Sequence, residues 1–440
     1  LQSEFLNELK IWGFSTSKHN QVLKSLGELK EYHDKFEKER FNLEYDLDGL
    51  VYKINDLKLQ KRLGFTSNSP RWAIAHKFSA DNAYSEILNI DVQVGRTGAL
   101  TPVAKIKPIN IGGVIVSNAT LHNEDEISRK DIRKGDTVKI ERAGDVIPHV
   151  IEVDLKKRKK NSARFQFPIK CPSCGSKTFK EYNLTTKKYD AVRRCSNEGF
   201  NCEKIAIEKI KHFISKEALN IEGLGKKVVE KFWELKFIRF PQDIFKLDYN
   251  KISKLDGWGN QSTSNLKYSI DQSKNVNLEK FIFSLGIRHI GAENAKLIGD
   301  YSINIKNFLD IINKKKINQF INIDGIGETQ INSMSHFFKN KDNLNIVYKL
   351  SDILNIKSRE LNKKGKLNNQ SFMFTGKLID ISRAEAKNLT EQNLGNIVST
   401  VSKKLNYLVI GEKPTQKKVE LAKKVGVKIL TQQEWNNLLN

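Results

Sequence analysis

Two lysines lie within short apolar runs near the start of the chain, an unusual setting for a cationic side chain. Lys53 lies within the run Leu50–Ile54, and Lys77 lies within Trp72–Phe78. Both runs have the composition of β-strands. Singly, each lysine is explained as a strand residue that faces solvent. Because the arrangement is repeated, we favour two ammonium groups projecting from a sheet into one anion site, with Asp48 beside them for metal or polar contacts.

Four cysteines form two pairs, Cys171 with Cys174 and Cys195 with Cys202. Two residues separate the first pair and six separate the second. Four thiolates fit a closed tetrahedral Zn²⁺ site, which leaves no position open for catalysis. The alternative is four unrelated buried cysteines. Four cysteines in 440 residues do not make a disulfide framework, so we expect a reducing, cytoplasmic environment.

A short glycine-containing unit recurs four times between residues 220 and 338, each time followed by apolar residues at helical spacing. The last glycines of the units lie 34, 32 and 36 residues apart, which indicates an internal repeat. Glycine turns that open helices let the backbone approach a phosphate closely. The units resemble helix-hairpin-helix elements, which implies contacts with nucleic-acid backbone rather than bases. The candidate contacts are Gly223, Gly225, Gly257, Gly259, Gly291, Gly325 and Gly327.

Two alternatives qualify this interpretation of the repeats. A single unit would be better explained as a tight helix–helix turn, but four in tandem in a basic chain favour DNA binding. His289 stands where the other repeats have glycine, so we expect the third turn to bind phosphate less well or differently.

Composition is consistent with a soluble DNA-binding protein. Hydrophobic residues make up 39% and charged residues 29% of the 440, which predicts roughly three or more globular domains. The net charge of +24 favours a polyanionic partner, although a lysine-rich proteome would give the same value. We expect no membrane span, because no apolar run approaches the ~18 residues that one needs.

The remaining elements are predicted from local patterns. Short strands broken by Gly and Pro in residues 81–158 favour an OB-fold barrel. The basic run Lys156–Lys160 is expected to be a solvated linker. In the tail, a strand at Phe372–Phe374, a capped helix at Ser382–Glu391 and a closing Trp435 resemble a BRCT domain.

The two lysine motifs carry a family resemblance. Asp-Gly-Leu-Val-Tyr-Lys, which ends at Lys53, and Trp-Ala-Ile-Ala-His-Lys-Phe, which contains Lys77, resemble the last two nucleotidyltransferase motifs of bacterial NAD-dependent DNA ligases. The resemblance implies that both lysines lie at the adenylate phosphate. It also implies that Asp48 is an acidic residue needed for the chemistry and that Arg40 is a basic residue at the nucleotide site.

The expected barrel resembles the OB domain of the same family in residues 94–102, 119–123 and 142–148. This resemblance implies DNA contacts near the nick for Arg96, Thr97 and Arg142, with Val146 and Ile147 packing in the minor groove. The family also has a four-cysteine zinc module at this place in the domain order.

One departure concerns the nucleophile, which in this family is the lysine of a Lys-x-Asp-Gly motif upstream of the other motifs. Here the only match is Lys254–Gly257, inside the second repeat, and we interpret it as coincidence. The chain also begins with Leu1 rather than Met. We therefore expect a fragment that lacks the nucleophile and is inactive with NAD on its own.

The resulting fold prediction is multidomain α+β. We expect a partial nucleotidyltransferase (adenylation) domain, an OB-fold barrel, a zinc module, a four-repeat helix-hairpin-helix domain and a BRCT α/β domain. Their ranges are 1–80, 81–158, 159–205, 206–355 and 366–440.

The resemblance implies a ligase that seals 5′-phosphate/3′-hydroxyl nicks through enzyme-AMP and DNA-adenylate intermediates, in replication and repair. It implies NAD, Mg²⁺ (or Mn²⁺) and Zn²⁺ as cofactors and nicked double-stranded DNA as the partner. We further expect a nucleoid-associated bacterial monomer whose BRCT domain meets a replication or repair protein. The alternatives are a non-catalytic, structure-selective DNA-binding protein built from ligase domains, or a clamp-loader or nuclease subunit. The last alternative predicts a P-loop or an acidic nuclease cluster, and the sequence contains neither.

Overall fold

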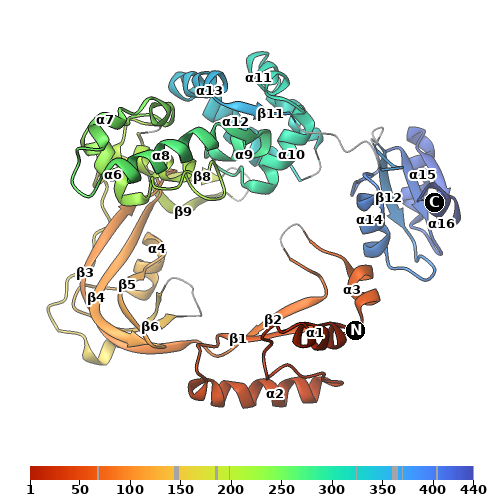
Figure 1. The fold of residues 1–440 in the computed structure, drawn as a ribbon, viewed down its shortest axis with the longest axis horizontal. Helices are drawn as coiled ribbons and strands as arrows, with labels where there is room; N and C mark the ends of the chain where they lie inside the picture. The colour runs from red at the N-terminus through yellow and green to blue at the C-terminus, as the bar shows by residue number, and fades with distance from the viewer. Residues whose placement is uncertain are drawn as a thin grey trace. The chain divides into compact units, whose positions relative to one another are not determined.

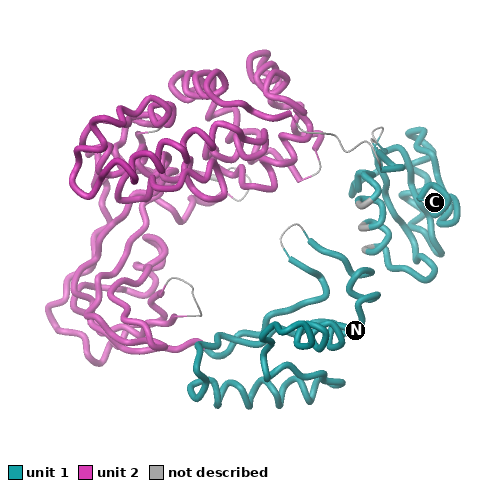
Figure 2. The backbone as a smooth tube through the Cα atoms, in the orientation of Figure 1, with its two compact units in different colours: residues 1–79, 361–440 teal, residues 80–360 magenta. Residues whose placement is uncertain are grey.

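The computed structural model describes residues 1–66, 69–142, 148–183, 187–197, 199–323, 325–358, 365–368, 370–402 and 405–439. The chain divides into two compact units (Figure 2). The first contains residues 1–79 and 361–440, and the second contains residues 80–360. Within the described part of the chain, every helix is too short or too polar to span a lipid bilayer.

The first unit opens with helices that lead into a small sheet. Their bounds are α1 Gln2–Ile11, α2 Leu26–Glu39, η1 Arg40–Asn42 and α3 Leu57–Leu63. Both predicted strands are present, as β1 Gly49–Lys53 and β2 Ala73–Lys77, and they pair antiparallel. Helix α2 begins where the Ser25 hydroxyl accepts a hydrogen bond from the Glu28 backbone N–H at 3.2 Å. Asp56 caps α3 in the same way.

The tail of the first unit is a parallel sheet in the order β13–β12–β14–β15. Helices α14 and α16 contribute Ala386 and Trp435 to one apolar core, and α15 contributes Ala422 to another. Strand β12 is buried along its whole length, as expected for a sheet covered on both faces. The element bounds are β12 Ser371–Thr375, α14 Arg383–Gln392, β13 Asn396–Ile397, β14 Tyr407–Ile410, α15 Gln416–Val425, β15 Lys428–Thr431 and α16 Gln432–Leu439.

The second unit begins with a closed five-stranded barrel in the order β3–β4–β5–β7–β6 (Figure 1). The long strand β3 closes it, because residues 81–86 pair with β6 and residues 87–94 pair with β4. The register of β3 against β4 shifts between Ile87 and Asn89. The bounds are β3 Asp81–Val94, β4 Leu100–Ile111, β5 Val114–Thr120, α4 Glu124–Lys130, β6 Thr137–Arg142, β7 His149–Val153 and η2 Leu155–Lys157.

An antiparallel hairpin, hereafter the zinc-module hairpin, follows the barrel as β8 Thr178–Asn183 and β9 Lys188–Cys195. Helix α5 Glu203–Phe213 then enters a helical domain whose core contains Phe213, Phe232 and Phe308. Its elements are α6 Lys226–Glu234, η3 Pro241–Lys246, α7 Tyr249–Ile252, α8 Asn260–Ser273, β10 Asn275–Asn277, α9 Leu278–Ser284, α10 Ala292–Ser302, α11 Ile305–Asn313, η4 Ile317–Asn322, α12 Glu328–Lys339, α13 Lys341–Ile353 and β11 Asn355–Lys357.

Candidate functional sites

Lys53 and Lys77 lie on the same face of the β1–β2 sheet. In the antiparallel ladder, Gly49 lies opposite Lys77 and Lys53 lies opposite Ala73. Lys53 is an even number of residues from Gly49, so its side chain points to the same face of the sheet as that of Lys77. Four residue steps along the strands separate them, or roughly 13 Å. The face between them is open, since Val51 is 59% exposed. The sheet therefore carries two cations toward one exposed strip.

Asp48 is fixed against the second lysine. Its carboxylate forms an ion pair with the Lys77 ammonium, and its backbone carbonyl accepts a hydrogen bond from the Phe78 N–H at 3.0 Å. This approach requires glycine at position 49, because a Cβ there would lie 2.5 Å from the His76 carbonyl oxygen. Most of the Asp48 and Lys77 side chains still face solvent, at 55% and 62% exposure. Both groups can therefore meet a ligand.

Arg40 reaches the same end of the sheet. It opens η1, and its guanidinium carbon lies 4.7 Å from the centre of the Phe41 ring and 5.6 Å from that of the buried Phe78. Because Phe78 directly follows Lys77, these contacts place Arg40 at the same end of the strands as Lys77. The buried His33 ring contacts both Phe78 and His76, and the His76 side chain points to the face opposite Lys77, so Arg40 lies on that other face. The structure thus brings Asp48 and Lys77 into contact, places Arg40 at the same end of the strands on the other face, and leaves Lys53 at the opposite end.

The four cysteines come together although they lie in separate elements. Cys171 and Cys174 lie in a turn, Cys195 ends β9, and Cys202 directly precedes α5. All four are free thiols whose sulfur atoms lie within 4.8 Å of one another. The Cys174–Cys195 distance is 3.5 Å and the Cys171–Cys202 distance is 4.0 Å. Sulfurs at the corners of a zinc tetrahedron with ~2.3 Å bonds would lie about 3.8 Å apart, so the set is compatible with zinc.

Burial adds an electrostatic argument for a cation. Desolvation raises the pKa of the Cys195 and Cys202 thiols, and neighbouring cysteines add to the effect. The thiolate forms of these two cysteines are therefore costly unless a positive charge offsets them, whereas at Cys174 desolvation is outweighed by hydrogen bonding from Ser176 and from neighbouring cysteines, which lowers its pKa to about 6.

The barrel positions most of the predicted DNA contacts near its ends. Thr97 lies in the turn between β3 and β4, where its hydroxyl accepts a hydrogen bond from Arg194 at 3.3 Å. Arg96 packs against the helical domain, since a Cβ at Gly286 would lie 3.1 Å from Arg96 Nη1. Burial lowers the pKa of Arg96. Arg142 is the last residue of β6 and lies opposite Asp81 in the β3–β6 ladder. Val146 and Ile147 lie outside the described residues.

The four repeat turns share one backbone form. The last glycine of each is the N-cap of the next helix: Gly225 of α6, Gly259 of α8, Gly291 of α10 and Gly327 of α12. Two positions earlier the backbone is left-handed, with φ of +83° at Gly223, +77° at Gly257 and +91° at Gly325. His289 holds the same conformation, with φ of 62°. The third turn therefore keeps the hairpin shape without the glycine.

The first two turns also line one cleft of about 840 Å³, to which Gly223 and Gly257 both contribute. The Lys254–Gly257 motif belongs to the second of these turns, and Lys254 is exposed there. Lys254 therefore belongs to the second compact unit, whereas Lys53 and Lys77 belong to the first.

Comparison with known proteins decides the family. Residues 1–81 match the model of the NAD-dependent DNA ligase adenylation domain, and residues 84–162 match that of the NAD-dependent DNA ligase OB-fold domain. The chain is 62% identical over 440 residues to the DNA ligase of Pelagibacter ubique (strain HTCC1062), covering 100% of this chain and 65% of that protein. The chain belongs to the NAD-dependent DNA ligase family.

Further matches agree with this assignment. Residues 280–347 match a helix-hairpin-helix motif, and residues 362–439 match the BRCA1 C Terminus (BRCT) domain. The DNA ligase of Wolbachia pipientis wMel is 43% identical over 447 residues, covering 100% of this chain and 66% of that protein. The chain thus spans about two thirds of the length of these curated relatives.

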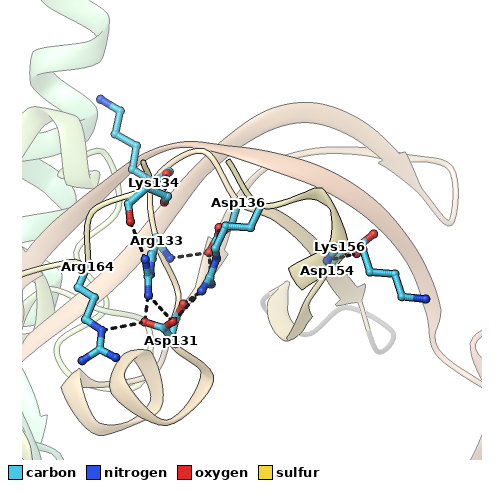
Figure 3. Close-up of polar contacts among 9 residues, drawn as sticks. Asp131, Arg133, Lys134, Asp136, Asp154, Lys156 and Arg164 are labelled. Atoms are coloured by element: carbon cyan, nitrogen blue, oxygen red, sulfur yellow. Dashed lines mark hydrogen bonds and ion pairs between the residues drawn. The ribbon is translucent and has the colours of Figure 1, made fainter. Parts of the chain in front are cut away.

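The ligase OB-fold region also contains a charge network that the sequence prediction missed (Figure 3). The fully buried Asp136 accepts hydrogen bonds from Arg158 Nε at 2.9 Å and from the Arg133 backbone N–H at 2.8 Å. Asp131 accepts from Arg133 Nη2 at 2.7 Å and from Arg158 Nη1 at 2.6 Å. The prediction that Lys156–Lys160 is a solvated linker is therefore wrong for Arg158, whose side chain is only 13% exposed.

This network makes stability of the ligase barrel depend on pH. Hydrogen bonding by Arg133, aided by Arg158 and opposed by desolvation, lowers the pKa of Asp131 from 3.8 to about 2. A lowered folded-state pKa stabilises the fold above the unfolded-state pKa, and the effect is lost as pH falls through the folded value. We expect the wild type to unfold less readily than Asp131→Asn at pH 7 and the difference to disappear between pH 4 and 2.

Chemical denaturation of both proteins across that pH range would measure this difference. Asp91→Asn removes a carboxylate from the same barrel outside this network and provides the control. A difference between wild type and Asp131→Asn that stays constant down to pH 2 would contradict the role of the carboxylate.

Proposed function

We propose that this chain is part of an NAD-dependent DNA ligase that seals 5′-phosphate/3′-hydroxyl nicks in duplex DNA during replication and repair. The reaction would pass through enzyme-AMP and DNA-adenylate intermediates. The observation that carries the proposal is the Asp48–Lys77 pair on one sheet face with Lys53. It occurs in a chain 62% identical to a protein named DNA ligase.

In this function the basic side chains neutralise phosphate. Phosphoryl transfer depends chiefly on positioning and on cations near the oxygens that gain charge. Lys53 and Lys77 approach one phosphate from the two ends of the exposed strip, and Arg40 binds the nucleotide. The exposed Asp48 carboxylate suits Mg²⁺ or Mn²⁺, which would supply further neutralisation of phosphate charge.

The other modules hold the nicked duplex. The OB-fold residues Arg96, Thr97 and Arg142 contact DNA near the nick, with Val146 and Ile147 in the minor groove. Glycines of the hairpin turns contact the DNA backbone at a distance from the nick. Zn²⁺ held by the four cysteines would stabilise the fold of residues 159–205. We further propose a cytoplasmic, nucleoid-associated monomer whose BRCT domain binds a replication or repair protein.

The direct test is a chimera, hereafter the completed protein, in which residues 1–440 replace the matching 65% of the Pelagibacter ubique DNA ligase, and its readout is NAD-dependent closure of a nicked duplex. We expect closure by the completed protein. We expect no self-adenylylation by residues 1–440 alone, because their one Lys-x-Asp-Gly lysine, Lys254, lies in a hairpin turn. A completed protein that binds nicked DNA but seals none would favour the non-catalytic alternative.

Binding of nicked duplex by residues 1–440 is expected to weaken steeply with salt. Contacts to phosphate release counterions, and each one adds about −0.9 to the slope of log affinity against log salt concentration. Fluorescence anisotropy at salt concentrations from about 50 to 200 mM measures this slope. Over that range, a protein that makes several phosphate contacts loses ~10³-fold in affinity. A flat response would remove the case for a backbone-binding surface.

A further inference from the structure

The third hairpin, residues 287–291, has the backbone shape of the other three but different surroundings. The left-handed position is occupied by His289, whose carbonyl oxygen accepts a hydrogen bond from Asn294 Nδ2 at 2.9 Å. A left-handed conformation costs an L-residue about 1 kcal/mol or more relative to glycine. The imidazole also stands where glycine would leave the backbone open to a phosphate. The shape is therefore retained here without the feature that serves phosphate binding.

Arg288 of this hairpin is already engaged by protein carboxylates. Its Nη1 lies 2.6 Å from both Glu181 carboxylate oxygens, and its Nη2 lies 3.8 Å from Asp190 Oδ2. Glu181 lies in β8 and Asp190 in β9, so both carboxylates belong to the zinc-module hairpin. Charge-assisted hydrogen bonds of this kind are about twice as strong as neutral ones. The charge of Arg288 is thus used in contacts with protein carboxylates.

Arg194 extends the contact to the barrel. This residue directly precedes the zinc-site Cys195 and is only 9% exposed. Its Nη2 donates to Asp190 Oδ2 at 3.3 Å, and its Nη1 donates to the Thr97 hydroxyl at 3.3 Å. Two arginines and two carboxylates therefore connect the third hairpin, the zinc-module hairpin and the barrel turn that carries Thr97.

The helix that follows the third hairpin also carries an acidic residue at its start. Glu293 lies in the first turn of α10, where its carboxylate complements the positive end of the helix. Helix α12 after the fourth hairpin has Glu328 in the same place, so this charge adds to the contacts of Arg288 but does not by itself set the third hairpin apart. The first hairpin offers the opposite arrangement, since α6 begins with the exposed residues Lys226 and Lys227. A phosphate would therefore be repelled at α10 and attracted at α6.

We propose that the third hairpin is a docking element and not a DNA-backbone contact. Arg288 acts as a positioning residue that holds residues 287–291 on the zinc-module hairpin and, through Arg194, fixes the Thr97 turn. Gly291 is then removed from the candidate DNA contacts. The inference rests on the proposed DNA-binding function, and it assigns the DNA contacts to the first, second and fourth hairpins but not to the third.

Two matched substitutions test the division. Gly225 and Gly291 are both N-caps with extended backbone, and a Cβ at either would have no atom within 4 Å. Aspartate is a favoured N-cap, so Gly225→Asp and Gly291→Asp should fold while placing a carboxylate where a phosphate would bind. We expect Gly225→Asp to weaken binding of nicked duplex on the order of tenfold and to make the salt slope shallower by about 1. Gly291→Asp should change neither.

Arg288→Ala, with Arg288→Lys beside it, separates docking from DNA contact. Hydrogen exchange in the absence of DNA should become faster in β8, β9 and residues 287–291, while the salt slope stays at the wild-type value. A slope shallower by about 1 with unchanged exchange would overturn the proposal, as would equal losses in Gly225→Asp and Gly291→Asp. If the wild type shows no salt-dependent binding, the proposed function fails, and the exchange measurement alone decides the docking.

Discussion

Replacing Cys171 with serine is expected to abolish metal binding and to unfold residues 159–205. Half of the buried residues in the apolar cluster around the cysteines are cysteines themselves, namely Cys171, Cys195 and Cys202, and the other half, Val94, Leu100 and Ile205, come mainly from neighbouring elements. A module with so small a core depends on its metal, and structural zinc contributes about 10–16 kcal/mol in small zinc-binding peptides. Native mass spectrometry should show loss of the ion, and hydrogen exchange should show loss of protection in β8 and β9.

Unfolding of residues 159–205 should also weaken DNA binding, because the zinc-module hairpin contacts both the barrel and the helical domain. We expect the affinity for nicked duplex to fall on the order of a hundredfold, as for loss of a folded element worth a few kcal/mol. Lys170→Ala, an exposed neighbour of Cys171, should leave zinc content and affinity unchanged. A serine variant that retains β8 and β9 protection without metal would show that the module folds on its own.

The second large effect is expected at Lys77. In the completed protein, Lys77→Ala should slow nick closure by 10²-fold or more, since loss of one preorganised charge at a transferring group costs about that much. Asp48→Asn should have a comparable effect, because the carboxylate also orients the Lys77 ammonium. Both side chains are mostly exposed, so thermal stability should change little.

Separate steps identify what each residue does. The mass gain of one AMP with NAD reports self-adenylylation, and closure of a pre-adenylylated nick reports the last step. Lys58→Ala, an exposed lysine of α3, is the matched control. If Lys77→Ala leaves both steps at wild-type rates, the anion-site interpretation of the sheet face is wrong.

Local patterns predicted the elements that carry these residues. Strand composition located Lys53 and Lys77 on β1 and β2, and their shared face follows from the antiparallel register. The cysteine pairs indicated a cluster before any geometry was known. The Ser382 cap correctly began α14, because its hydroxyl accepts from the Glu385 N–H three residues on. All of these signals act over a few residues.

Contacts between distant residues were not predictable in the same way. The bonds from Arg158 to Asp136 and from Arg288 to Glu181 join residues 22 and 107 positions apart. Neither periodicity nor spacing records such partners, so a basic run looked solvated and four hairpins looked alike. The predicted site residues in the barrel and hairpins, and the domain boundaries, stay predictions until the DNA complex is measured.

The register shift in β3 has a consequence for comparing relatives of different length. Ile87 and Ile90 are both buried although they are three positions apart, because the shift at the exposed Leu88 reverses the inward–outward alternation. Deleting Leu88 would restore simple alternation and leave both isoleucines inside. Deleting Asn89 would have the same effect, because it also lies between the two isoleucines and is exposed. Deleting one residue of β3 on either side of Ile87–Ile90 would turn part of the strand's apolar face outward. Alignment gaps of one residue within this strand are therefore expected at Leu88 or Asn89 before any other position.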